Sequence, residues 1–223
     1  MMLIDEDSLK LWHGDWREVW PLDCDAVVTD PPYGIKAQHS SGMVGGGKTW
    51  NGKVVEAQVF AHIHADSDKS EAADAIEAMR DVKSQAWFGG EHLYQFFPPE
   101  WTWVVWDKRN GASDFADCEM VIHSGGGAVR KFEWLWNGAM RKGGNHIRRV
   151  HPNEKPVELM MFVLSKLNLP DGATVFDPFA GSGTVGAACQ RMGYSYVGCE
   201  IVETYAEAAA TRLDQRGLWE SAR

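Results

Sequence analysis

Short apolar runs that end at an acid or a glycine alternate along this chain with stretches of helical period, a pattern typical of α/β folds. Residues 8–14 and 25–29 read as short strands, and each is followed by an acid, Asp15 or Asp30. Residues 35–53 are rich in Gly and Ser and have no usable periodicity, which predicts a long mobile loop. Loops of this length in compact domains tend to be functional.

The middle of the chain alternates helix and strand patterns. The apolar period predicts a helix over residues 71–82, and a second helix begins at Pro156 and runs to residue 168. Proline suits the first helical turn because its missing N–H has no partner there. Four segments between these helices predict strands, at residues 86–90, 101–108, 118–125 and 131–138, and all but the third are rich in aromatic residues.

The last fifty residues predict a βαβ unit. A strand leads into a glycine turn, a helix ends at Gly193, and a second strand ends at Glu200 before a final helix over 203–216. A nucleotide-binding half needs a third strand, for which the N-terminal strand before Asp15 is the candidate. The expected fold is therefore a circularly permuted, Rossmann-like α/β sheet, mostly parallel, with helices on both faces and the acids at the carboxyl ends of strands.

Length and composition fit one cytosolic globular domain. The chain has 223 residues, 44% hydrophobic and 24% charged, so we expect a single domain over 1–223. No run of eighteen apolar residues and no apolar signal segment occurs, so neither a membrane span nor a secretion signal is expected. The four cysteines form no CxxC pair, which disfavours zinc-finger spacing.

The net charge of −9 argues against a nucleic-acid partner, but one stretch reverses it. Residues 130–155 hold seven Lys and Arg against two acids, a net of +5. Either a solvated basic face or a phosphate-binding surface accounts for such a cluster.

The glycine turn has the form GxGxxG, from Gly181 to Gly186, with Glu200 closing the next strand. Such glycines allow a ligand to approach the backbone, and the acid can accept hydrogen bonds from ribose hydroxyls; a need for close helix–strand packing is the alternative. NAD also suits the pattern, but Asp177 before the turn would repel a pyrophosphate. A ligand with a cationic centre and an ammonium group fits better.

The segment from Asp30 to Gly34 reads DPPYG, in which an acid ends a strand before two rigid prolines and an aromatic ring. A proline-rich turn is one interpretation. The other interpretation is a site that binds an exocyclic amino group of a nucleobase. The nitrogen of such a group becomes a better nucleophile when a carboxylate and a backbone carbonyl accept hydrogen bonds from it. Tyr33 could then stack on a base taken out of the helix.

With these motifs the chain resembles the beta class of S-adenosylmethionine-dependent DNA amino-methyltransferases. The resemblance rests on DPPYG, on FDPFAGSGT as the cofactor loop, on GCE closing the next strand, on HPNEKPVEL before the loop, and on their permuted order. It implies that the target amino group meets Asp30, Pro31, Pro32 and Tyr33. It implies S-adenosylmethionine as the cofactor, bound by Asp15, Lys155, Asp177, Phe179, Gly181, Gly183, Thr184 and Glu200.

The resemblance also implies DNA as the partner, with a flipped target base. A small recognition region is expected at 110–150, with Arg141, Lys142, Arg148 and Arg149 as candidate DNA contacts. Its size suits short or relaxed specificity, as in an enzyme of a phage or another mobile element. The oligomeric state stays open, with a homodimer as one alternative.

The expected reaction is methyl transfer to the 6-amino group of adenine, because in the family an acid at position 30 favours adenine. The 4-amino group of cytosine is the nearest alternative, and an RNA or protein glutamine methyltransferase is a third. A P-loop nucleotide-binding module is a distant one, because residues 42–49 match GxxxxGKT without the flanking strand and helix. No metal is expected, since the spacing of His62, His64, Asp66 and Asp68 fits an exposed strand or turn better than a ligand set.

Overall fold

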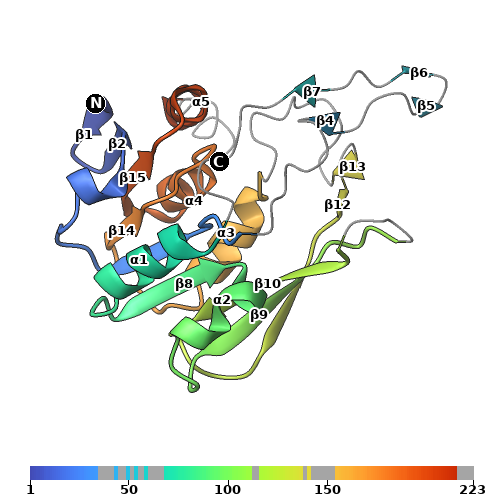
Figure 1. The fold of residues 1–223 in the computed structure, drawn as a ribbon, viewed down its shortest axis with the longest axis horizontal. Helices are drawn as coiled ribbons and strands as arrows, with labels where there is room; N and C mark the ends of the chain where they lie inside the picture. Colours follow the sequence, from blue (N-terminus) through green and yellow to red (C-terminus); the bar gives the residue numbers. More distant parts are fainter. Residues whose placement is uncertain are drawn as a thin grey trace.

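A nine-stranded mixed sheet forms the centre of the protein (Figure 1). The computed structural model describes residues 1–34, 68–111, 116–136 and 154–214 in full, and the backbone alone at 43–44, 49–50, 53–54, 58–59, 137 and 140–141. The strands lie in the order β1 (Met2–Glu6), β2 (Leu9–His13), β15 (Ser195–Glu200), β14 (Thr174–Asp177), β3 (Ala26–Thr29), β8 (Ser84–Phe88), β10 (Cys118–His123), β9 (Thr102–Asp107) and β11 (Arg130–Glu133).

The sheet has the permuted order expected from the sequence. The N-terminal β2 pairs parallel with β15, and β3 pairs parallel with β14, so the C-terminal βαβ unit is inserted between two N-terminal strands. Seven strands run in one direction, while β1 and β10 run antiparallel to their neighbours. The expected position of the third strand of the nucleotide-binding half is therefore confirmed.

Helices cover both faces of the sheet, as expected. In the central strands, alternate residues belong to two separate apolar clusters: Val27 and Phe176 face one side, while Val28 and Val175 face the other. The first side is covered by α1 (Ser70–Ala78), and the second by α3 (Val157–Leu164), α4 (Thr184–Met192) and α5 (Glu203–Asp214). Burial on both faces explains why these strands are continuous apolar runs.

The element boundaries differ from the sequence prediction in a few places. Pro156 is extended and precedes α3 instead of lying in its first turn, and α3 ends at Leu164, before the expected end. The strand β1 and the short helices α2 (Gly90–Leu93), η1 (Trp16–Glu18) and η2 (Tyr94–Phe96) were not predicted. The glycine turn is as expected. Gly183 and Gly193 both have a left-handed backbone conformation, and they cap α4 at its N-terminal and C-terminal ends.

Part of the expected loop at 35–53 has strand structure. Met43–Val44 (β4) pairs with Gln58–Val59 (β7), and Thr49–Trp50 (β5) pairs with Lys53–Val54 (β6). A P-loop needs a helix to begin at its Lys-Thr pair, so the strand at Thr49 contradicts the P-loop alternative. The rest of this segment lies outside the described residues.

A further short pair joins Trp136–Asn137 (β12) to Met140–Arg141 (β13). Among the helices that the structure describes, none is both long and apolar enough to cross a membrane.

Candidate active site

Four neighbouring parallel strands each lead to an acid at one pocket. Asp15 follows β2, Glu200 ends β15, Asp177 ends β14, and Asp30 follows β3. The space between these elements is about 1030 Å³ when the solvent at its open side is included. It lies at the carboxyl edge of the sheet, where open α/β folds bind ligands.

The pocket brings together eleven of the twelve residues predicted for catalysis and cofactor binding: Asp15, Asp30, Pro31, Pro32, Tyr33, Lys155, Asp177, Phe179, Gly181, Thr184 and Glu200. The twelfth, Gly183, does not line the pocket. A Cβ there would lie 3.1 Å from the Cβ of Ala209 on α5, and its φ is +74°. Gly183 therefore serves the turn and the close approach of α5.

Glu200 organises the glycine loop. One carboxylate oxygen accepts the backbone N–H of Gly181 at 2.8 Å, and the other accepts that of Val202 at 2.8 Å. Burial raises the pKa of Glu200, and these backbone hydrogen bonds partly offset the effect. A carboxylate has about four acceptor sites, so capacity remains for ligand hydroxyl groups.

Asp177 is almost fully buried and bound to neutral donors. Its Oδ1 accepts the Thr29 hydroxyl at 2.6 Å and the Phe179 N–H at 3.2 Å, and its Oδ2 accepts the Tyr196 hydroxyl at 3.4 Å. Burial raises the pKa of Asp177 to about 7, although the Thr29 hydrogen bond acts in the opposite direction. Burial therefore makes this carboxyl group easier to protonate than an exposed aspartate.

Lys155, predicted to bind cofactor, contacts the acid of the catalytic motif. Its ammonium pairs with Asp30 Oδ2 and lies 3.5 Å from Glu119 Oε2. Asp30 Oδ1 is buried and has no hydrogen-bond partner among the described residues. Burial raises the pKa of Asp30, and the charge of Lys155 opposes that rise. One oxygen of Asp30 is thus held in place while the other keeps its acceptor capacity.

Tyr33 is more enclosed than its predicted stacking role suggests. Its ring stacks on His92 with centroids 5.1 Å apart, and it is only 8% exposed. A Cβ at Gly89 would lie 2.5 Å from the Tyr33 ring, so this glycine allows the ring to pack against the backbone. His92 therefore already covers one face of Tyr33.

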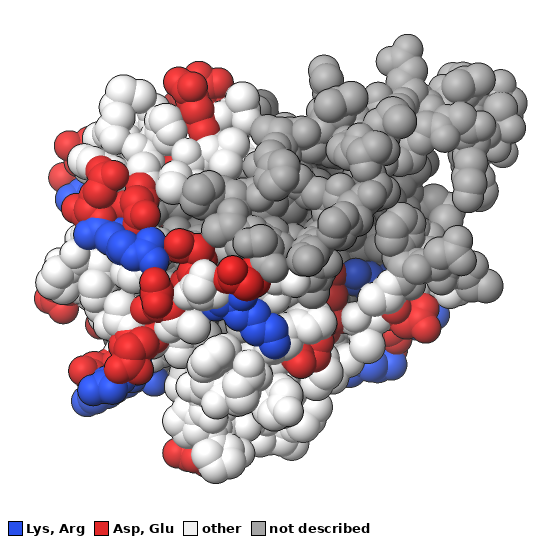
Figure 2. All heavy atoms as spheres, viewed as in Figure 1, with Lys and Arg blue, Asp and Glu red and all other residues white. Residues whose placement is uncertain are grey.

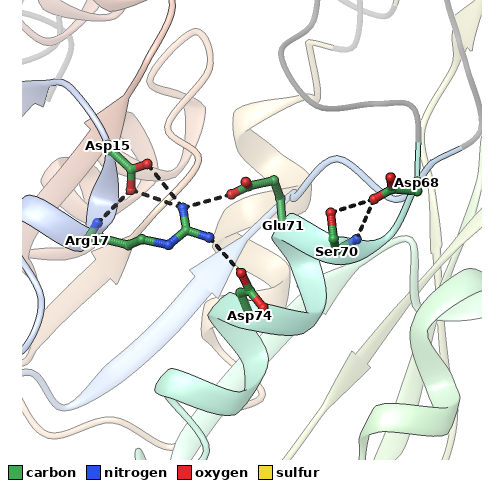
Figure 3. Close-up of polar contacts among 6 residues, drawn as sticks. All are labelled: Asp15, Arg17, Asp68, Ser70, Glu71 and Asp74. Carbon is green, nitrogen blue, oxygen red and sulfur yellow. Dashed lines mark hydrogen bonds and ion pairs between the residues drawn. The ribbon is translucent and has the colours of Figure 1, made fainter.

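Asp15, which lines the pocket, belongs to an ion-pair cluster (Figure 3). Its carboxylate accepts the backbone N–H of Arg17 and pairs with the Arg17 guanidinium at 3.1 Å. Figure 3 shows this guanidinium bridging to α1, where it meets Glu71 at 3.0 Å and Asp74 at 2.9 Å. The sequence prediction missed Arg17 and Glu71, because nothing in their spacing connects η1 with α1.

A second arginine, Arg212 on α5, binds three residues that line the pocket. It pairs with Glu154 and donates to Thr184 Oγ1 at 2.9 Å and Ser182 Oγ at 3.3 Å. Thr184 was predicted to bind the cofactor, and in this structure its hydroxyl accepts from Arg212. Neither Arg212 nor Glu154 was predicted.

Negative charge dominates the pocket. Among the described residues that line it, six carry a carboxylate and one an ammonium: Asp15, Asp30, Glu71, Glu154, Asp177, Glu200 and Lys155. Arg17, Arg212 and Lys155 pair with four of the acids, whereas the hydrogen bonds of Asp177 and Glu200 come from neutral donors. Figure 2 shows acidic side chains also gathered on the surface over β1, β2 and α1. A cationic ligand fits this pocket better than a pyrophosphate.

The basic stretch at 130–155 is partly neutralised by the protein itself. Lys155 is buried in its ion pairs, and Lys131 pairs with Glu133 and with Asp107 at 3.6 Å. The candidate DNA contacts lie outside the residues whose side chains are described: Arg141, Lys142, Arg148 and Arg149. Only the backbone of Arg141 is described, in β13.

Of the four residues weighed as metal ligands, the structure describes Asp68. Its carboxylate accepts the N–H and the hydroxyl of Ser70 at the start of α1. No cluster of potential metal ligands occurs within the described parts of the chain.

The sheet order and the acid-tipped strands define a Rossmann-like methyltransferase fold. Two solved structures share it: the M1.HpyAVI–SAM complex, with a TM-score of 0.57 and 19% identity over 92% of this chain and 99% of that one, and the cytosine-N4-specific PvuII DNA methyltransferase, with a TM-score of 0.56 and 14% identity over 97% and 90%. At these identities the likeness establishes the fold alone.

Residues 126–211 match the family model N6_N4_Mtase, described as DNA methylase, which confirms the resemblance inferred from the motifs. The matched part contains the cofactor loop and Glu200, whereas DPPYG lies outside it.

Among curated proteins, the Type II methyltransferase M2.DpnII of Streptococcus pneumoniae is 25% identical over 113 residues, and the putative methylase YubD of Escherichia coli (strain K12) is 42% identical over 65 residues. These alignments cover 50% and 29% of this chain. They span only 41% and 28% of the relatives' own length.

Proposed function

We propose that this protein transfers a methyl group from S-adenosylmethionine to the 6-amino group of adenine in DNA. The observation that carries the proposal is the buried Oδ1 of Asp30, which has no hydrogen-bond partner in the described part of the chain and lies in a pocket that it shares with the glycine loop. Burying a hydrogen-bond acceptor without a donor costs free energy, because the acceptor gives up its hydrogen bonds to water and gains none in return. An amino group of a substrate base would supply that donor.

The residues of the pocket fit the cofactor. Glu200 has acceptor capacity for ribose hydroxyls, and the negative charge of Asp177 and Glu200 suits a sulfonium and an ammonium group. Asp15 lines the same pocket, and we assign it to the adenine of the cofactor. The relatives named above that carry a methyltransferase name, and the SAM complex with the same fold, support this choice of cofactor.

S-adenosylmethionine supplies an electrophilic methyl group on its sulfonium. Asp30 Oδ1 accepts one N–H of the target amino group, and a backbone carbonyl of the rigid Asp30–Pro32 segment accepts the other, which favours a tetrahedral nitrogen with its lone pair available. The nitrogen–carbon bond forms as the sulfur–carbon bond breaks. The positive charge that develops on nitrogen is stabilised by Asp30, and one amino proton then leaves for this carboxylate or solvent.

The choice of base rests on Asp30, because the acid at this position favours adenine in the family that the chain resembles. The 4-amino group of cytosine has similar chemistry, and one of the proteins with this fold is cytosine-N4-specific. We therefore propose adenine on the basis of Asp30 alone.

DNA contacts are proposed for the stretch around Arg141, Lys142, Arg148 and Arg149. The described residues that line the pocket carry six acids and one lysine, so phosphate binding needs cations from other parts of the chain. The base would enter the pocket flipped out of the duplex.

Mass spectrometry of nucleosides from DNA incubated with the protein and S-adenosylmethionine tests the proposal. We expect 6-methylaminopurine with the wild type and its loss in Asp30→Asn. The appearance of 4-methylaminocytosine alone would contradict the choice of base. The absence of any methylated base across varied DNA sequences would contradict the proposed function.

Cofactor affinity should rise by roughly tenfold between about pH 5.5 and pH 7.5. Burial raises the pKa of Asp177 to about 7 in the free protein, and only the ionised carboxylate attracts a cation. Binding therefore favours loss of the Asp177 proton, so affinity is lost as pH falls through 7. Calorimetry across this range measures the effect, and Asp177→Asn is expected to flatten it. A wild-type affinity independent of pH would exclude Asp177 as a partner of the cation.

A further inference from the structure

A line of four buried or partly buried charges leads away from the pocket. Asp30 pairs with Lys155, whose ammonium lies 3.5 Å from Glu119 Oε2, and Glu119 Oε1 lies 2.6 Å from Lys108 Nζ. The four residues come from the end of β3, the segment before α3, strand β10, and the residue after β9. Lys155 is only 4% exposed, whereas Glu119 and Lys108 do not line the pocket.

The charges along this line alternate in sign, so the strength of each ion pair depends on the neighbouring one. A buried ammonium is costly unless its partners compensate for lost hydration, and here two carboxylates share it. Glu119 in turn divides its attraction between Lys155 and Lys108. A change at Lys108 or Glu119 therefore alters how strongly Lys155 holds Asp30, without any contact to a ligand.

Several other groups face Asp30 and contribute to its electrostatic environment. Lys155 opposes the effect of burial, and Glu119 and Glu91 add to it. The groups are Lys155 before α3, Glu119 on β10, Glu91 on α2, Tyr33 in its own segment and Asp177 on β14. Of these groups, Lys155 contacts Asp30 directly and Glu119 contacts Lys155.

We propose that Glu119 and Lys108 are positioning residues that act through Lys155 to set the charge and orientation of Asp30. This inference rests on the proposed function, in which Asp30 accepts a hydrogen bond from the target amino group. Lys155 pairs with Oδ2 of Asp30 while Oδ1 stays available for the substrate. Glu119 weakens this ion pair because it attracts the same ammonium group.

The two residues should act in opposite directions. Glu119→Gln removes a negative charge that disfavours ionisation of Asp30, and it leaves Lys155 with one carboxylate. The pKa of Asp30 should fall. Lys108→Gln removes the cation that neutralises Glu119, so Lys155 is drawn toward Glu119 and the pKa of Asp30 should rise.

The first measurement is the pH dependence of kcat for methyl transfer at saturating DNA and cofactor. Its acid limb should move down by about one pH unit in Glu119→Gln and up by a similar amount in Lys108→Gln. Glu77→Gln is the control, because Glu77 also pairs with a cation, Arg80, but on the exposed face of α1 and outside the expected recognition region. Its profile should match the wild type. A purely structural role would lower kcat without opposed shifts of the limb.

The second measurement needs no activity. Titration of protein labelled with ¹³C at aspartate carboxyls, with Asp30→Asn used to assign the signal, follows Asp30 directly. Opposed shifts in the two variants support the inference; unchanged or parallel shifts overturn it. If Glu119→Gln fails to fold in a thermal melt, the upward shift in Lys108→Gln decides alone. Absence of methyl transfer by the wild type would instead refute the proposed function, and the titration would still test the charge network.

Discussion

Asp30→Asn should lower kcat by about 10²–10³-fold, the range for losing one preorganised electrostatic group at a reacting centre. Asparagine keeps the size of the side chain but removes the charge that stabilises the developing cation. It also leaves the Lys155 ammonium with Glu119 as its carboxylate partner. Affinity for S-adenosylmethionine should stay within a few-fold of the wild type, because Asp30 follows β3, whereas the glycine loop lies between β14 and α4.

Single-turnover kinetics and calorimetry separate these two effects. Asp81→Asn is the matched control, since Asp81 is exposed in the turn after α1, away from the pocket. A variant at Asp30 that retains wild-type turnover would remove this carboxylate from the mechanism.

Glu200→Ala should weaken cofactor binding by about 1.5–3 kcal/mol, the range for charge-assisted hydrogen bonds. This corresponds to about 10–150-fold in Kd. The structure adds a second effect, because the Gly181 and Val202 N–H groups lose the carboxylate that binds them. The free protein should therefore also melt at a lower temperature.

Calorimetry gives the affinity, and thermal melts without cofactor give the effect on the loop. Glu203→Gln is a suitable control, as Glu203 is exposed three residues further along and does not line the pocket. Unchanged affinity in Glu200→Ala would contradict the assignment of this acid to the cofactor site.

The sequence predicted the acids of the pocket and the permuted placement of β2 and β3 beside the C-terminal βαβ unit, because the strands and the acids that close or follow them are visible as local patterns. Asp30, Asp177 and Glu200 each close or follow an apolar strand, and parallel strands bring their carboxyl ends to one edge. The strand β1 was missed because it is a largely exposed edge strand whose last two residues are acids, with a third acid directly after it. Its pairing with β2, and not its own composition, makes it a strand.

Contacts between distant segments were the part that the sequence did not predict. Lys155 was recognised as a site residue, but its partner Asp30 lies 125 positions earlier in the chain. Glu119 was missed because a single acid in a short strand is usually solvent-facing, and only the sheet brings Lys155 and Lys108 to its two oxygens. An acid within such a strand, together with a cation predicted for the site, is the signal that would have suggested the pair.

The permuted strand order also affects how the protein is made on the ribosome. The last two strands to be synthesised, β14 and β15, are the ones that join β1 and β2 to the sheet part that contains β3 and β8. At about 5–20 residues per second, the two N-terminal parts wait several seconds with an unpaired strand edge each, a state prone to association with other chains. Asp15 and Asp30 therefore come to one pocket only after Glu200 has been added, so we expect no methyl transfer from a nascent chain that stops before β15.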